Sequence, residues 1–182
     1  MKRKIITLLL ALGLAVGTAT TAFAADYSGH WYSDTVEWSI NHRIIEEYDN
    51  MMAGPIPRWM AWLMLMNTER PAARWEQPND IRDAAIWVEA RGISDGQRPC
   101  STLTRAEFGT MLYRMVGMTH REEPFYFKDA FRDGASVPWW ANDSLNWAIG
   151  GGLIHGDDYG YLNPNGDIKG VEALTILRRV AM

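Results

Sequence analysis

Cysteine is almost absent from this chain of 182 residues, which has Cys100 alone. One cysteine excludes a disulfide bond within the chain. Small exported domains often depend on disulfides, so this fold has to be held by its apolar core. Nine tryptophans and ten methionines can supply that core. Cys100 follows Pro99 and has no histidine near it in sequence, so we interpret it as a turn residue rather than a nucleophile.

Positive charge is also in short supply. The chain has 18 lysines and arginines against 22 aspartates and glutamates, a formal net charge of −4. A nucleic-acid-binding protein presents a concentrated positive surface, so the composition argues against a nucleic-acid partner. It leaves room for an anionic ligand held by a few local arginines.

Long apolar runs are missing beyond the first residues. The chain begins with three basic residues at 2–4, continues with the apolar run 5–16, and has Ala22-Phe23-Ala24 where a signal peptidase reads small residues. The run is shorter than the roughly 20 residues that span a bilayer. We therefore predict a signal peptide at 1–24 and no membrane span after its cleavage. Removing its three basic residues from the 18 leaves 15 against 22 acidic ones.

The usual catalytic and metal-binding motifs are absent too. The four histidines, at 30, 42, 120 and 155, form no His-Glu-x-x-His pair, and the chain has no Gly-x-Ser-x-Gly elbow. Asp157 and Asp158 are consecutive acids in a loop, which are more often solvated than paired as in a glycosidase. The segment 161–172 partly fits a calcium loop, but Tyr161 stands where the first acidic ligand belongs. The sequence predicts no enzyme, no cofactor and no metal.

What the chain does contain is a repeated pattern. In three places a tryptophan-bearing amphipathic segment ends six residues later in a branched apolar residue, and a second apolar helix follows. The three pairs are Trp38 and Ile44, Trp87 and Ile93, and Trp147 and Leu153. A repeat too small to bury its own apolar face has to pack on its copies. Core packing is accordingly the expected role of these three tryptophans.

The apolar spacing predicts an all-α chain of three helix pairs. We expect first helices over about 33–48, 80–92 and 142–149, with Asn142 or Asp143 capping the last of them. Second helices are expected from Pro57, from Thr104 and over 173–180. A short strand near 125–127 is the one exception. Thr104 and Glu107 fit a capping box, in which each side chain bonds the other residue's backbone N–H.

These motifs together resemble the S-layer homology (SLH) family. Its opening loop is similar to residues 28–31 (Ser-Gly-His-Trp), its second-helix start to residues 103–107 (Leu-Thr-Arg-Ala-Glu), and its glycine loop to the segment carrying Gly156, Gly160 and Pro164. The resemblance divides the chain into modules at 25–70, 71–120 and 121–182. It implies a three-pronged pseudo-trimer, with one helix of each module in a central three-helix bundle.

The resemblance also implies a function. SLH triplets attach exported proteins non-covalently to secondary cell-wall polysaccharides, often ones carrying pyruvate ketals, at the bacterial surface or S-layer. The motif arginine contacts the acidic group, and the helix N-terminus beneath it offers free N–H groups. We therefore expect Arg105 to serve the principal groove and Arg58 the second. The third module has Gly170 at this position and the neighbouring Lys169 as a substitute charge, and the first has Met60 in place of the capping glutamate.

Other residues complete the predicted site. Trp31 and Trp140 precede their helices, where an indole can stack on a sugar ring or simply pack. Gly156 is expected to serve backbone geometry and close approach of the ligand. Two rival functions stay open: a diverged scaffold that binds a surface protein partner, and a small exported wall hydrolase.

Overall fold

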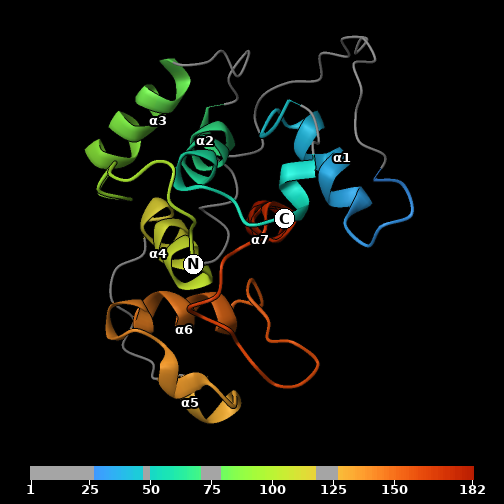
Figure 1. Cartoon of the computed structure of the whole chain (residues 1–182), viewed down its shortest axis with the longest axis vertical. Helices are drawn as coiled ribbons and strands as arrows, with labels where there is room; N and C mark the ends of the chain where they lie inside the picture. Colours follow the sequence, from blue (N-terminus) through green and yellow to red (C-terminus); the bar gives the residue numbers. More distant parts are fainter. Residues whose placement is uncertain (1–26, 47–49, 71–78, 118–126) are drawn as a thin grey trace.

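The computed structural model of the chain describes residues 27–46, 50–70, 79–117 and 127–182. These residues are mostly helical (Figure 1), as the all-α prediction requires. The predicted signal peptide, and residues 125–126 of the expected strand, lie outside the described residues; Phe127 begins a short helix instead. The helices are α1 (Ser33–Asn41), α2 (Arg58–Glu69), α3 (Asn79–Ala90), α4 (Arg105–Met115), α5 (Phe127–Ala130), α6 (Asn142–Gly150) and α7 (Gly170–Ala181), with 3₁₀ turns η2 (Asn50–Ala53), η3 (Gly134–Ser136) and η4 (Trp139–Ala141).

The first helix is shorter than the sequence pattern predicts. It ends at Asn41, not near Tyr48, because Arg43 adopts the left-handed conformation with φ of 57°. Gly92 and Gly152 occupy the same place after α3 and α6, with φ of 65° and 69°. The chain reverses there and buries the apolar residue that follows.

Two helix starts differ in how they are capped. α4 begins with the predicted capping box: Thr104 Oγ1 accepts from the Glu107 N–H at 3.2 Å, and Glu107 Oε2 accepts from the Thr104 N–H at 3.0 Å. The prediction for α6 was wrong. Ala141 is its N-cap residue and no side chain caps it, so Asn142 is already helical.

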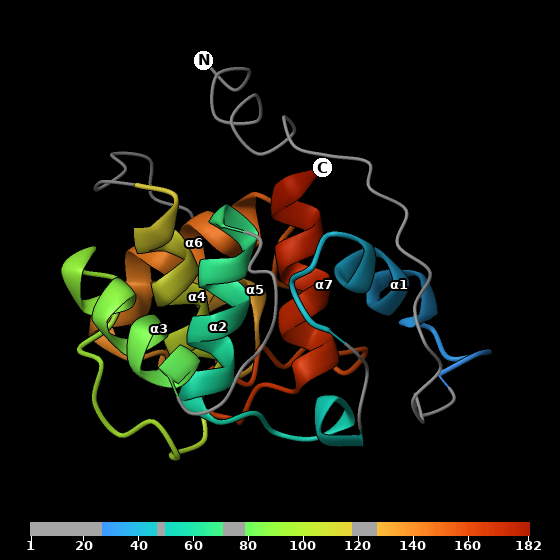
Figure 2. The same ribbon diagram turned by 90° about the horizontal axis from the view of Figure 1, so that it is seen from above.

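The helices pack in a cyclic order. α3 packs on α2, α6 on α4, and α1 on α7, and the two ribbon views agree in placing these pairs side by side (Figures 1 and 2). Each first helix therefore packs on the second helix of the preceding helix pair, and the first pair closes on the last. α2 also contacts both α4 and α7.

A ring of backbone hydrogen bonds joins the segments that precede α2, α4 and α7. Ile56 N–H donates to the Ile168 carbonyl at 3.1 Å, Ile168 N–H to Leu103 at 2.8 Å, and Leu103 N–H to Ile56 at 3.2 Å. All three side chains are fully buried. Within the described residues, extended backbone pairs at isolated antiparallel bridges around this ring.

The tryptophans that anchor the repeat pack as expected. Trp87 and Trp147 are buried, and Trp38 is partly buried against the same core. Trp147 meets Tyr113 edge-on, with ring centroids 5.6 Å apart. Each large side chain removed from water contributes about 1.5–3 kcal/mol, so the core compensates for the absence of a disulfide. None of the helices placed in the described segments has the length and apolarity needed to cross a membrane.

Candidate ligand-binding cleft

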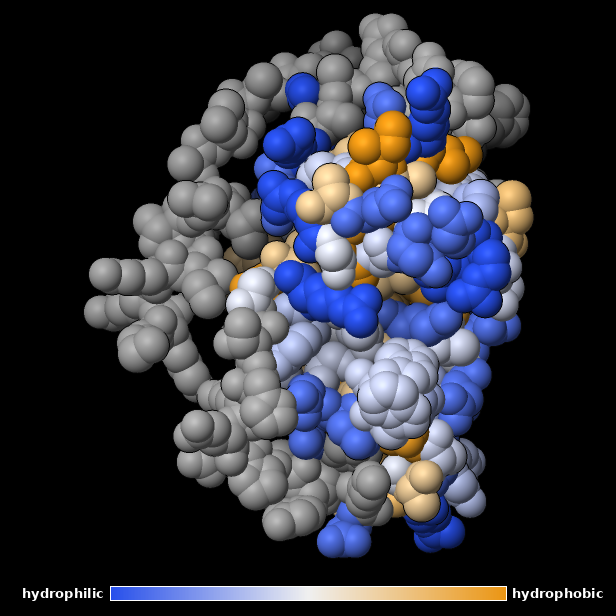
Figure 3. All heavy atoms as spheres, turned by 90° about the vertical axis from the view of Figure 1, so that its left-hand side faces the viewer, coloured by the Kyte–Doolittle hydropathy of each residue, from blue (hydrophilic) through white to orange (hydrophobic). Residues whose placement is uncertain are grey.

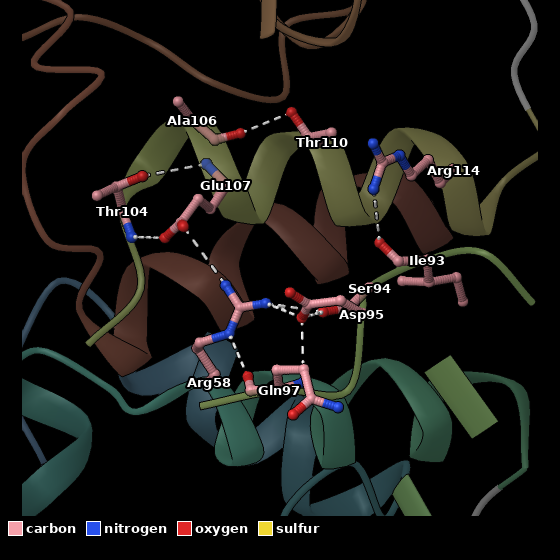
Figure 4. Close-up of polar contacts among 10 residues, drawn as sticks. All are labelled: Arg58, Ile93, Ser94, Asp95, Gln97, Thr104, Ala106, Glu107, Thr110 and Arg114. Carbon is pink, nitrogen blue, oxygen red and sulfur yellow. Dashed lines mark hydrogen bonds and ion pairs between the residues drawn. The ribbon is translucent and has the colours of Figure 1, made fainter. Parts of the chain in front are cut away.

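Arg58 lies at the centre of a polar network between α2, α4 and the loop that joins α3 to α4 (Figure 4). Its Nε donates to the Gln97 carbonyl at 3.1 Å, and its Nη2 donates to Ser94 Oγ and Asp95 Oδ1, both at 2.9 Å. Its Nη1 lies 3.4 Å from Glu107 Oε1. The side chain is 6% exposed, so most of its donor capacity is used inside the protein.

Two carboxylates neutralise this buried guanidinium. Glu107 serves both the α4 capping box and the contact with Arg58. The pKa of Asp95 is lowered from its ordinary value, chiefly because the Gln97 N–H donates a hydrogen bond to the carboxylate. Partial burial opposes this effect, and the Arg58 charge and its hydrogen bond reinforce it. Asp95 is therefore ionised at neutral pH.

A cleft of about 210 Å³ opens beside this network. Its lining includes Arg58, Asp95, Glu107 and two further arginines, Arg98 and Arg114. Trp140 closes it from η4 and remains 43% exposed. The cleft is thus lined by three arginines, one accessible indole and two carboxylates, and both carboxylates are already paired with Arg58.

Arg105 repeats the arrangement of Arg58 one helix pair further along the chain. Its Nε donates to the Leu162 carbonyl at 3.1 Å and its Nη2 to the His155 carbonyl at 2.9 Å. Its Nη1 lies 3.5 Å from Glu172 Oε2, and Glu172 bonds the Lys169 N–H at the start of α7 as Glu107 does at the start of α4. The side chain is 15% exposed.

The third position of this pattern has lost both charged partners. Gly170 replaces the arginine and Met60 replaces the glutamate. Met52 fills the space: a Cβ on Gly170 would lie 2.8 Å from Met52 Cα and 2.9 Å from its carbonyl oxygen. Met52 and Met60 are both buried. This interface is therefore closed by apolar packing.

The expectation of free N–H groups at the second-helix starts was wrong. Arg58 and Trp59 N–H donate to the Ser101 and Pro99 carbonyls. Arg105 and Ala106 N–H donate to Gly166 and Pro164, and Gly170 N–H donates to Gly54. Loop carbonyls satisfy these donors because each loop folds over the helix start beside it.

The remaining predicted residues lie apart from the cleft. Trp31 is 71% exposed and meets Tyr32 edge-on, and Lys169 is exposed at the start of α7. Gly156 adjoins the Arg105 network, but its space is taken: a Cβ there would meet the Phe131 ring and come within 2.9 Å of the Tyr161 carbonyl. The structure brings Arg58, Glu107 and Trp140 together and leaves Arg105 in a separate network.

Sequence reasoning missed Arg98 and Arg114. A repeated position in the sequence could have drawn attention to Arg114. Its side chain donates to the Ile93 carbonyl, as the Asn67 side chain does to the Ile44 carbonyl and the Arg179 side chain to the Leu153 carbonyl. The three acceptors are the branched apolar residues that end the tryptophan segments of the repeat. Each donor lies nine residues after the first residue of its own helix, which is α2, α4 or α7. Arg98 lies where the glycine loop is interrupted, and no pattern pointed to it.

The calcium-like segment has other partners in the structure. Asn165 donates to the Ser136 carbonyl, and Glu172 accepts from Lys169 and pairs with Arg105. Across the ranges that the structure describes, no three His, Cys, Asp or Glu side chains gather in a way that can hold a metal ion.

Comparison with known proteins identifies one family to which part of the chain is similar. Residues 130–174 match the S-layer homology domain. The match runs from the end of α5 through α6 and the glycine loop into α7. This domain is a binding module rather than a catalytic family, and it anchors proteins to wall polymers at the cell surface. No curated protein and no solved structure matches the chain.

Proposed function

We propose that the chain is a secreted, non-catalytic wall anchor made of three SLH-like modules arranged about a pseudo-threefold axis. The cyclic helix pairing, the ring through Ile56, Leu103 and Ile168, and the repeated arginine–glutamate networks all support this arrangement. The domain match over 130–174 supports wall attachment.

The ligand we propose is an anionic secondary cell-wall polysaccharide, of the kind that carries pyruvate ketals. The observation that carries this proposal is the cleft lined by Arg58, Arg98, Arg114 and Trp140. An indole face stacks on the C–H face of a sugar, and the planar guanidinium pairs with the two oxygens of an acidic group. A cleft with both features suits a charged saccharide better than a neutral one.

Co-sedimentation with bacterial wall sacculi tests the proposal. We expect the full chain to bind sacculi and to lose binding when acid treatment strips the secondary polymer. Trp140→Ala should weaken binding about tenfold, because the indole face that packs on the C–H face of the sugar is removed. Trp139→Ala is the matched control, because Trp139 is 83% exposed and is not part of the cleft lining.

Other outcomes would favour a rival. Equal binding to stripped sacculi would direct the site to peptidoglycan. Absence of binding to any sacculi would favour a scaffold for a surface protein.

The face over α3, α4 and α6 is mainly hydrophilic, with separate small apolar areas (Figure 3). A protein-docking surface commonly has one large continuous apolar patch, and this face does not show one.

A further inference from the structure

The three arginines of the cleft differ in how far the protein itself occupies them. Arg58 has four protein acceptors around its guanidinium and is almost fully buried. Its charge is matched by Asp95 and Glu107. A ligand anion would have to displace those carboxylates, so Arg58 is poorly suited to bind one directly.

Arg98 is the opposite case. It is exposed, lines the cleft, and its guanidinium has no hydrogen bond or ion pair with any described residue. Its backbone is nevertheless held in the left-handed region, with φ of 54°. Strain of this kind persists where the surroundings enforce it, and it often accompanies a functional position.

The surroundings that enforce it include Arg58. Arg58 Nε binds the Gln97 carbonyl, and the Gln97 N–H binds Asp95, which itself pairs with Arg58. On the other side of Arg98, the Pro99 carbonyl accepts from Trp59 N–H. Both neighbours of Arg98 are thus fixed, although its own side chain is free.

Arg114 reaches the same cleft from the last turn of α4 (Figure 4). One of its N–H groups donates to the Ile93 carbonyl at 3.2 Å. The residue is exposed, and no described carboxylate pairs with it. Its remaining donors are available to a ligand.

We propose that Arg98 and Arg114 bind the acidic group of a sugar unit that stacks on Trp140, and that Arg58 is a positioning residue for the Arg98 loop. The acidic group is a carboxylate or a phosphate. This inference rests on the proposed wall-binding function and assigns its ionic contact to residues outside the SLH motif.

The test measures the affinity of the full chain for polymer-bearing sacculi at two salt concentrations. Arg98→Gln should lower the affinity about tenfold or more, the loss typical of one charge-assisted hydrogen bond. It should also reduce the salt dependence, because one ionic contact is gone. Arg82→Gln is the matched control: it removes the same charge from an exposed position on α3 outside the cleft lining. Its affinity should equal that of the wild type.

A double variant tests the positioning role of Arg58. Arg58→Gln alone should weaken binding, yet Arg58→Gln combined with Arg98→Gln should bind no worse than Arg98→Gln alone. Additive losses would overturn the positioning role and show that Arg58 contributes separately. Thermal unfolding of each variant identifies any that fail to fold, and Arg98→Gln, being exposed, is expected to retain the wild-type midpoint.

The acidic group is identified on sacculi whose carboxylates have been amidated with a carbodiimide. Loss of binding identifies a carboxylate, and unchanged binding that still depends on Arg98 identifies a phosphate. If the wild type binds and Arg98→Gln binds equally well, the inference fails while the wall-binding proposal stands. If the wild type binds no sacculi, the wall-binding proposal itself fails.

Discussion

Arginines at different positions in this protein have different tasks. Arg58 and Arg105 begin their helices and are enclosed by protein acceptors, whereas Arg98 is exposed and unpaired within the described structure. Burial makes the first two effective at fixing loops, because removing one partner of a buried pair leaves an uncompensated charge. Exposure leaves the third able to meet a ligand.

Arg43 is a residue at which the protein departs from its own repeat. It adopts φ of 57° where the equivalent turns after α3 and α6 have glycine. The left-handed conformation costs a residue with a side chain about 1–2 kcal/mol, partly offset by the greater chain entropy lost when glycine folds. We expect Arg43→Gly to raise the free energy of unfolding by about 0.5 kcal/mol, measured by urea denaturation.

The reciprocal change provides its control. Gly92→Ala places a side chain where φ is 65° and where a Cβ has no heavy atom within 4 Å. It should destabilise through the backbone alone. If both substitutions act in the same direction, backbone strain is not the cause.

Asp95 gives a pH-dependent prediction. Because its pKa is lowered on folding, its stabilising effect is complete above its ordinary value of 3.8 and is lost as pH falls through the folded value. Asp95→Asn should therefore cost about 0.5 kcal/mol at pH 7, the size of a partly exposed ion pair. The difference from wild type should shrink as the pH is lowered further below 3.8. Urea unfolding at pH 7 and at acidic pH measures it, and a constant difference would exclude the ionised pair as its source.

At the scale of elements, the contact of α7 with η2 explains why the start of α7 carries no arginine. The start of α7 lies against the Met52 backbone, at a place where its counterparts in α2 and α4 carry arginine. The absence of the arginine at Gly170 and the absence of the glutamate at Met60 depend on each other. A side chain at Gly170 has no room, and an unpaired glutamate at Met60 would be buried without a partner.

Gly170→Ala should consequently destabilise the protein by about 1–3 kcal/mol, the usual cost of overpacking. Helix propensity alone predicts the opposite sign. Gly150→Ala at the end of α6 is the control, because a Cβ there meets nothing within 4 Å. Thermal unfolding compares the two, and an undiminished midpoint in Gly170→Ala would show that the Met52 contact relaxes easily.

The elements were largely predictable from sequence, and the residues of the cleft were predictable only in part. Apolar spacing and the capping box located α2, α3, α4, α6 and α7, because those signals are local. The end of α1 was missed because Arg43 occupies a position that glycine usually marks. The sequence pointed to Arg105, Arg58 and Trp140, and it did not point to Arg98 and Arg114, which line the cleft beside Arg58 and Trp140 once the helices have packed.

At the scale of the whole molecule, stability is shared among the three helix pairs. The ring through Ile56, Leu103 and Ile168 belongs to all three, and each first helix packs on a neighbour's second helix. Such interlocking makes independent unfolding of one helix pair unfavourable, because the apolar face of its partner would be exposed.

Leu103→Ala tests this sharing. Truncating a fully buried leucine should cost about 2–5 kcal/mol. Hydrogen exchange should then show protection falling by a similar amount in α4, which Leu103 precedes, and in α1, which packs on α7. Retained protection of α1 would show that the helix pairs unfold separately.

The pairing of α1 with α7 has a kinetic consequence. The apolar face of α1, which ends at Asn41, is covered only when α7, which begins at Gly170, packs against it. Contacts between such distant parts of a chain slow folding, because a long loop has to close first. During synthesis, α1 is made well before α7, so it gains this partner only after Gly170–Ala181 have been made, and completion of the native packing depends on α7.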